Sequence, residues 1–266
     1  MTWRQRSRVL LRMPVLVLAT GLSGLLLLPA VPFEWIWPTG RARWINRVFR
    51  TWSRLFLALL RVRVHQQGEP PKTPTFLVSN HLGYMDIPLL ASRLDTVFIA
   101  KAEISSWPIF GWICRLAATV FIDRTLKRDI PRALGQIDRR LAHRQGVVLF
   151  PEGTSWAGAE VRPFRPSLLE AAAQGGYSVS YASLAYRTPE GESPAHLAVC
   201  WWADMAFARH FIELLALPRF DAWLTFGSEP ITDEDRKQLA RRLHDAMSAQ
   251  FRPTVDAEEL LESPRE

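Results

Sequence analysis

The chain has 266 residues, 48% of them hydrophobic and 11% aromatic, a length and composition that allow one large folded domain and exclude a wholly disordered chain. Its formal net charge of +7 is typical of proteins that contact nucleic acid, an anionic membrane surface or an acidic protein. Cys114 and Cys200 lie too far apart for a CxxC motif, so neither a zinc site nor a disulfide scaffold is predicted. No RNA-recognition signature accompanies the arginines, so we expect anionic membrane lipids as partners and no nucleic acid.

The first element in the chain is an uncharged segment, residues 13–33. As one continuous helix it would extend about 30 Å, enough for the hydrocarbon core of a bilayer. Arginines lie on both sides of it, and the positive-inside tendency places both flanks on the cytoplasmic face. Pro29 and Pro32 would permit a re-entrant hairpin instead. A spanning helix and a hairpin therefore both remain open, whereas "LPA" before Val31 makes a poor signal-peptide cleavage site.

Residues 42–60 repeat Trp, Ile, Phe and Leu at helical spacing with arginines between them. This pattern predicts an amphipathic helix that lies in the membrane interface. We therefore predict that residues 1–65 form an N-terminal membrane-anchoring segment, an apolar helix or hairpin followed by this interfacial helix.

From residue 66 onward, short apolar runs alternate with helical patterns. The predicted strands are 75–80, 96–101, 118–124, 146–150, 177–186, 196–202 and 220–227. The predicted helices are 128–145, 166–174 and 233–250, the last with Thr232 as N-cap and Asp235 in a capping box. The alternation indicates an α/β domain, residues 66–250, with a mixed, largely parallel sheet flanked by helices. Residues 251–266 are charged and contain two prolines, and we predict a mobile tail.

Three polar segments follow predicted strands, where ligands gather in open α/β sheets. The first is "SNHLGYMD", residues 79–86. Residues five apart are rotated by about 140° on a helix, so His81 must precede the first helical turn and Asp86 must reach back to it. The contact would be either structural or a reactive dyad, in which Asp86 accepts Nδ1–H of His81 and leaves Nε2 as a base. Because no G-x-S-x-G nucleophile accompanies the pair, a reactive dyad would act on a hydroxyl of the substrate.

The second segment, "FIDR", ends at Arg124, whose guanidinium suits a phosphate oxygen or, alternatively, a surface salt bridge. The third, "FPEGTS", carries Glu152, Gly153 and Thr154. Glycine allows close backbone approach, so the N–H groups beyond it can bind an anion, although an ordinary turn has the same composition.

In this order and spacing, "NHLGYMD", "FIDR" and "FPEGTS" resemble the lysophospholipid acyltransferase family, which includes the 1-acylglycerol-3-phosphate acyltransferases of bacterial membranes. The resemblance covers about residues 70–230 and includes the block from Lys101 to Arg124, with its Lys-x-Glu and Pro-x-x-Gly. One feature departs from the family, because "SVSYASLAY" lacks the proline usual in that strand. This departure bears on the acceptor lipid rather than on the reaction.

The resemblance implies a glycerolipid acyltransferase-like fold with His81 as general base and Asp86 as its orienting partner. The acceptor hydroxyl would attack an acyl thioester, and backbone N–H groups after Asn80 would bind the oxyanion. Substrate-binding residues implied in this way are Asn80, Lys101, Arg124, Glu152, Gly153 and Thr154. Glu152, taken as an anion, would accept glycerol hydroxyls or orient Arg124.

The reaction implied is transfer of a fatty acyl group from acyl-CoA or acyl carrier protein to a lysophospholipid, first of all 1-acyl-glycerol-3-phosphate, to give phosphatidic acid. No metal and no cofactor are expected. The expected location is the bacterial inner membrane, with the catalytic domain on its cytoplasmic face. Another lysolipid acceptor such as lyso-ornithine lipid, a membrane-anchored hydrolase and a non-catalytic scaffold remain as alternatives.

Overall fold

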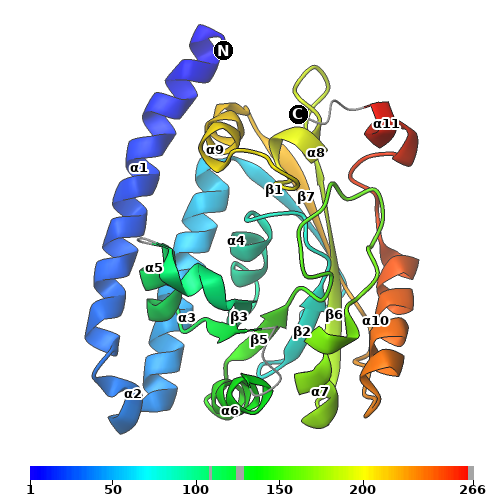
Figure 1. Cartoon of the computed structure of the whole chain (residues 1–266). Coiled ribbons are helices and arrows are strands. Elements are labelled where there is room, and N and C mark those ends of the chain that lie inside the picture. Colours follow the sequence, from blue (N-terminus) through cyan, green and yellow to red (C-terminus); the bar gives the residue numbers. More distant parts are fainter. Residues whose placement is uncertain (108–109, 124–128, 263–266) are drawn as a thin grey trace.

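The structure is a computed structural model that describes residues 1–107, 110–123 and 129–262 (Figure 1). Its strands are β1 (Val62–Gln67), β2 (Phe76–Ser79), β3 (Thr96–Lys101), β4 (Val120–Ile122), β5 (Gly146–Leu149), β6 (Val179–Arg187) and β7 (Phe220–Phe226). Its helices are α1 (Trp3–Leu27), α2 (Phe33–Ile36), α3 (Pro38–Leu59), α4 (Asp86–Ala91), α5 (Phe110–Leu116), α6 (Asp129–Ala142), α7 (Glu170–Gln174), α8 (Ala195–Ala198), α9 (Phe207–Ala216), α10 (Arg236–Gln250) and α11 (Ala257–Glu262). Short 3₁₀ turns occupy Leu28–Ala30, Ala102–Ser106 and Pro166–Leu168.

The described strands form one sheet in the order β1-β7-β6-β2-β5-β3-β4. Strands β2 to β6 are mutually parallel, whereas β7 pairs with β6 in antiparallel fashion and β1 is parallel to β7. The predicted mixed, largely parallel sheet is therefore confirmed. Five parallel strands end at the same edge, so the polar segments that follow them meet there.

Both faces of the sheet are covered, which explains why its central strands read as continuous apolar runs. Every residue of β2 and β5 is buried. Leu77 of β2 packs in one cluster with residues of α3, α4 and α9, whereas Phe76 and Val78 pack in a second cluster with residues of α6, α7 and α10. Successive side chains of a strand point to opposite faces, so one short strand contributes to both clusters.

The observed elements differ from the predicted ones in several places: α4, α5 and α9 were not predicted, and the predicted helix 166–174 is a 3₁₀ turn followed by α7. Residues 196–202 are not a strand; they contain the end of α8 and a turn, because the N–H groups of Ala198 and Val199 bond back to Pro194 and Ala195. A short buried apolar run does not distinguish a strand from a helical turn by periodicity. Helix α10, predicted as residues 233–250 with Thr232 as N-cap, begins at Arg236, because Asp235 is its N-cap and accepts from the N–H groups of Lys237 and Gln238. Strand β1 was not predicted, and the sheet therefore begins before the boundary expected at residue 66.

The N-terminal segment forms two long helices, α1 and α3, that lie side by side and run in opposite directions along one side of the molecule (Figure 1). The predicted amphipathic helix is α3, which buries Ile45, Val48 and Phe56. Among the described residues, one helical segment, Trp3–Ala30, is long and apolar enough to cross a membrane. The large apolar side chains that α1 leaves exposed are Trp3, Leu10, Leu11, Val15, Val17, Leu18, Leu22, Leu25 and Leu26.

Two arginines fasten α1 to the domain. Arg12 is buried and its Nη1 donates to the carbonyl oxygens of Leu215 and Leu217 at 2.8 and 2.6 Å. Arg8, one turn earlier, donates to the carbonyl oxygen of Ala216 at 2.8 Å. These carbonyls at the end of α9 have no helical partner of their own, so the arginines act as its C-terminal cap. As a result, α1 lies against the domain rather than extending away from it.

The segment predicted as a mobile tail begins with residues that pack on the domain. The N–H of Thr254 donates to the carbonyl oxygen of Gly158 at 2.8 Å, and its hydroxyl accepts from the N–H of Tyr186 at 3.1 Å. Val255 is buried. The chain after α10 therefore passes the loop that follows β5 and the end of β6.

We expect Arg12→Met to lower the free energy of unfolding by about 1.5–3 kcal/mol, because it removes charge-assisted hydrogen bonds and leaves buried carbonyls unpaired. Urea unfolding of the purified protein in neutral detergent measures the change. The matched control is Arg6→Met, which removes an exposed arginine of the same helix and should change stability by less than about 0.5 kcal/mol. Equal effects of the two substitutions would contradict the capping role of Arg12.

Candidate active site

The candidate site lies at the edge where the parallel strands end. His81 follows β2, Glu152 follows β5, and Tyr186 is near the end of β6. Because β2 lies between β5 and β6 in the sheet, these three side chains converge although they are far apart in the sequence.

Asp86 is the centre of the site, and its side chain is completely buried. Its Oδ2 accepts from Nδ1 of His81 at 2.7 Å and from the N–H groups of Leu82 and Gly83 at 2.7 and 3.0 Å. Its Oδ1 accepts from the hydroxyl of Tyr186 at 2.8 Å. Four donors thus compensate a carboxylate that has no access to water, as a buried charge requires. Asp86 reaches back to His81 as the spacing predicted.

The local sequence explains how the chain makes this tight loop. Gly83 has φ = 153°, and a Cβ atom there would lie 2.7 Å from the backbone nitrogen of Trp201. Glycine is therefore required, because the loop after β2 packs directly on the segment after α8. The N–H of Trp201 donates to the carbonyl oxygen of Leu82 at 2.8 Å and locks this contact. Asp86 then begins α4, so its side chain faces the loop it stabilises.

The imidazole of His81 is held on three sides and remains partly exposed, at 23% of its side chain. It stacks on Phe150, with ring centroids 4.1 Å apart, and the N–H of Trp156 donates to the His81 carbonyl oxygen at 2.9 Å. The carboxylate fixes the proton on Nδ1, so Nε2 carries a free lone pair. Within the described residues Nε2 makes no hydrogen bond, and a hydroxyl brought to it would meet an oriented base.

Tyr186 is a member of the site that sequence analysis missed. It is buried, and burial together with the neighbouring Asp86 raises the pKa of its hydroxyl, which therefore remains a donor. Its position in the sequence, 100 residues after Asp86, gives no signal of this contact. Only the pairing of β6 with β2 brings the two side chains together.

Asn80 and the N–H groups of the loop after it make structural hydrogen bonds. The sequence analysis expected Asn80 to bind substrate and these N–H groups to bind the oxyanion. Asn80 is buried, donates to the carbonyl oxygen of Leu184 at 3.0 Å and accepts from its N–H at 2.7 Å, so it joins the end of β2 to β6. The N–H groups of Leu82 and Gly83 bind Asp86 and are not available for an oxyanion. The sequence interpretation of this loop as an oxyanion site therefore does not hold for these two groups.

Glu152 is buried, with 4% of its surface exposed, and its environment differs from the one expected. Burial raises the pKa of its carboxyl to about 9. A hydrogen bond from the backbone N–H of His81 lowers this pKa, but its effect is smaller than that of burial. A pKa raised this far favours the neutral acid at pH 7, whereas the sequence analysis took Glu152 as an anion. Its Oε1 has no hydrogen-bond partner among the described residues.

The remaining expected residues are Gly153, Thr154, Lys101 and Arg124. Gly153 makes the turn after Glu152 with φ = 80°, and Thr154 is exposed. Lys101 is exposed at the end of β3, next to the end of β4. Arg124 lies outside the described residues. The structure adds Arg162, which sequence analysis did not single out.

Arg162 is half-buried and lies over the ring of Trp156 at 4.6 Å from the centroid. It also influences Glu152 electrostatically, which places its positive charge beside the His81 loop. A guanidinium that stacks on an indole keeps its N–H donors in a fixed plane, which suits Arg162 to contact with an anionic group.

The Glu152 carboxyl predicts a specific pH dependence of stability. Its folded-state pKa of about 9 exceeds the model-peptide value of 4.5, so the folded state holds one proton more than the unfolded state between these pH values. The contribution of Glu152 to the free energy of unfolding is therefore greatest below pH 4.5. It falls by about 1.4 kcal/mol per pH unit as the pH rises toward 9. Urea unfolding of Glu152→Gln, which keeps a neutral side chain, should lose this dependence. A constant difference between variant and wild type from pH 6 to pH 8 would show that Glu152 is already ionised.

Comparison with known proteins agrees with this geometry. The protein-family model described as Acyltransferase matches residues 61–184. Relatives include a lyso-ornithine lipid O-acyltransferase of Rhizobium meliloti, 34% identical over 214 residues that cover 75% of this chain and 72% of the relative. A 1-acyl-sn-glycerol-3-phosphate acyltransferase of Neisseria meningitidis is 27% identical over 208 residues, 77% of this chain and 80% of the relative.

The fold also has a solved counterpart. The crystal structure of the 1-acyl-sn-glycerophosphate acyltransferase PlsC from Thermotoga maritima superposes with a TM-score of 0.62 and 18% identity, covering 98% of this chain and all of that one. Both chains thus share one fold. The family model and the relatives in sequence show that the chain belongs to the acyltransferase family and is an O-acyltransferase.

Proposed function

We propose that this protein is a membrane-associated lysolipid O-acyltransferase, which moves a fatty acyl group from a thioester to a free hydroxyl of a lysolipid. The observation that carries the proposal is the 2.7 Å hydrogen bond between His81 Nδ1 and the fully buried Asp86, which leaves Nε2 as a base. The described structure places no serine or cysteine in hydrogen-bond contact with His81, in keeping with a hydroxyl that arrives on the substrate.

In the proposed reaction, Nε2 of His81 removes the proton of the acceptor hydroxyl as its oxygen attacks the thioester carbonyl. Asp86 and Tyr186 stabilise the imidazolium that forms, because the carboxylate is fixed next to Nδ1 before the reaction begins. Collapse of the tetrahedral intermediate forms the ester and breaks the carbon–sulfur bond. His81 returns the proton to the leaving thiolate, so the enzyme ends in its starting state.

For the acceptor we favour a lyso-ornithine lipid over 1-acyl-glycerol-3-phosphate. Four lyso-ornithine lipid acyltransferases match this chain at 29–34% identity over 208–250 residues. Two 1-acyl-sn-glycerol-3-phosphate acyltransferases match at 26–27% over 208 residues, and a third matches at 32% over only 111 residues. Arg162 offers an oriented cation for an acidic head group, and Lys101 and Arg124 stay predictions for the same task. Phosphatidic acid synthesis, the first expectation from sequence, is the second candidate.

The exposed apolar side chains of α1 support attachment to a membrane, where lysolipid acceptors reside. Because Arg8 and Arg12 hold α1 against the domain, we propose that α1 lies in one leaflet beside the domain rather than crossing to the far side. The bacterial inner membrane, with the domain on the cytoplasmic face, remains the proposed location. Acyl-CoA or acyl carrier protein is the proposed acyl donor, with no further cofactor or metal.

Tyr186→Phe removes one hydrogen bond to Asp86 and keeps the buried ring. We expect kcat to fall by about 10- to 150-fold with KM for the acceptor nearly unchanged, since a hydrogen bond to a charged group contributes about 1.5–3 kcal/mol. His81→Ala should abolish transfer, and Tyr181→Phe on the same strand is the matched control. A Tyr186→Phe enzyme with wild-type kcat and pH profile would show that the tyrosine does not assist the dyad.

The acceptor is tested by supplying purified protein with lyso-ornithine lipid or 1-acyl-glycerol-3-phosphate, each with acyl-CoA and with acyl carrier protein as donor. We expect a higher kcat/KM for lyso-ornithine lipid. A preference for 1-acyl-glycerol-3-phosphate would reverse the order of the two candidates. Acyl release in the absence of any acceptor, at the rate of transfer, would identify a hydrolase instead.

A further inference from the structure

A cavity whose lining does not include His81 lies at the bend between α1 and α3. It has a volume of about 310 Å³ and is formed by the 3₁₀ turn after α1, by α2 and by the first turns of α3. Its lining includes three arginines of α3, Arg41, Arg43 and Arg47, and three aromatic residues, Phe33, Trp37 and Trp44. None of these residues takes part in the site proposed above.

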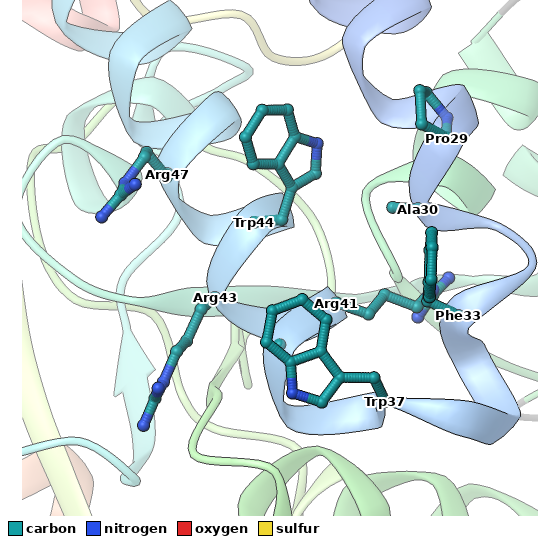
Figure 2. A pocket seen from close by; sticks show the side chains of 9 residues that line it. Pro29, Ala30, Phe33, Trp37, Arg41, Arg43, Trp44 and Arg47 are labelled. Carbon is teal, nitrogen blue, oxygen red and sulfur yellow. The ribbon is translucent and has the colours of Figure 1, made fainter.

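Arginines and aromatic rings alternate around the lining, with arginines on both sides of Trp37 and Trp44 (Figure 2). Arg41 reaches from α3 toward Phe33, and Arg43 and Arg47 leave the same helix on the other side of Trp37 and Trp44. Phe33, Trp37 and Trp44 are 43%, 62% and 41% exposed, so the entrance is bordered by apolar rings that face outward. A ligand that satisfies both the arginines and the rings must carry a negative charge and apolar chains.

Positive charge at this bend exceeds the negative charge that the described residues supply. Arg41 is 9% exposed, its Nε has no hydrogen-bond partner, and its ion pair with Glu34 is long, at 3.9 Å. Arg140 of α6 lies behind it, also with an unpartnered Nε. Burial and then the charge of Arg41 lower the pKa of Arg140 to about 10, which shows that the two guanidinium groups oppose each other. Buried cations of this kind are stabilised when an anion binds them.

The architecture of the bend is rigid enough to form a site. Trp44 Nε1 donates to the carbonyl oxygen of Leu26 at 2.7 Å and fixes α3 to the end of α1. Gly40 lies directly under the ring of Trp37, where a Cβ atom would overlap the indole. Asn46 accepts from Gln145 at 2.9 Å and joins α3 to the loop after α6. The arginines therefore project from a helix whose position is determined on both sides.

We propose that this bend, bounded by Arg41, Arg43, Arg47, Trp37 and Trp44, binds the phosphate head group of an anionic phospholipid of the surrounding bilayer. Guanidinium groups bind phosphate through paired N–H donors, and tryptophans lie at head-group depth in membranes. The lipid would be a resident ligand rather than the acceptor, because the acceptor hydroxyl must reach His81. It would hold the bend of the anchor at the membrane surface.

The test uses the full-length protein in a neutral nonionic detergent and isothermal titration calorimetry. The probes are dihexanoyl phosphatidylglycerol, dihexanoyl phosphatidylcholine with the same chains, and inorganic phosphate. Arg43→Gln/Arg47→Gln removes two exposed cations of the bend, so folding is not at risk, and Lys237→Gln/Arg241→Gln removes two exposed cations of α10 as a matched control. Trp37→Ala tests the aromatic rings.

We expect phosphatidylglycerol to bind at least about tenfold more tightly than phosphatidylcholine or inorganic phosphate, and Arg43→Gln/Arg47→Gln to weaken it at least about tenfold. The control pair should bind as the wild type does. Equal affinities of the bend variant and the wild type would overturn the proposal. So would an equal loss in the control pair, or inorganic phosphate that binds as tightly as the lipid. Because the readout is binding, a failure of the acyl-transfer proposal leaves this result unaffected.

Discussion

The structure of the candidate site depends on one buried carboxylate. Asp86 has no contact with water, and its charge is acceptable only because four donors surround it. Two of these donors are backbone N–H groups of the loop after β2, so the loop folds around the side chain that begins the next helix. The third is His81 and the fourth is Tyr186, which comes from a neighbouring strand. The need to compensate the charge of Asp86 therefore fixes three features together. These are the orientation of His81, the shape of the loop after β2 and the position of β6 beside it.

Residues on two sides of this carboxylate hold the loop and His81 in place. Asn80 joins β2 to β6 directly beside the loop, and Gly83 lets the loop contact the backbone of Trp201. On the other side of His81, Phe150 holds the ring and Trp156 holds the backbone. Glu152 completes this side as a neutral acid, since a second ionised carboxylate so close to Asp86 would be disfavoured by burial and by like charge. The "FPEGTS" segment thus supports His81 as much as it borders the site.

In the proposed function, the N-terminal helices connect this site to the membrane that holds the substrates. Arginines have two different uses in this segment. Arg8 and Arg12 cap the end of α9 and keep α1 on the domain, whereas the arginines at the bend of α1 and α3 are left without sufficient partners. The first use is structural and explains why the apolar helix lies along the protein. The second leaves a binding capacity, which an anionic lipid of the bilayer would satisfy.

The sequence by itself determined the α/β class, the amphipathic character of α3, the meeting of polar segments at strand ends and the contact of Asp86 with His81. These follow from local patterns: apolar period, strand ends, and a spacing of five residues that excludes a shared helix face. The sequence did not reveal β1, and it read residues 196–202 as a strand, because a short apolar run has the same appearance in both structures. Tertiary structure alone decided that Tyr186 meets Asp86, that Asn80 is used within the sheet, and that burial keeps Glu152 protonated. Strand order and solvent exposure set these properties, and both arise from contacts between residues far apart in the chain.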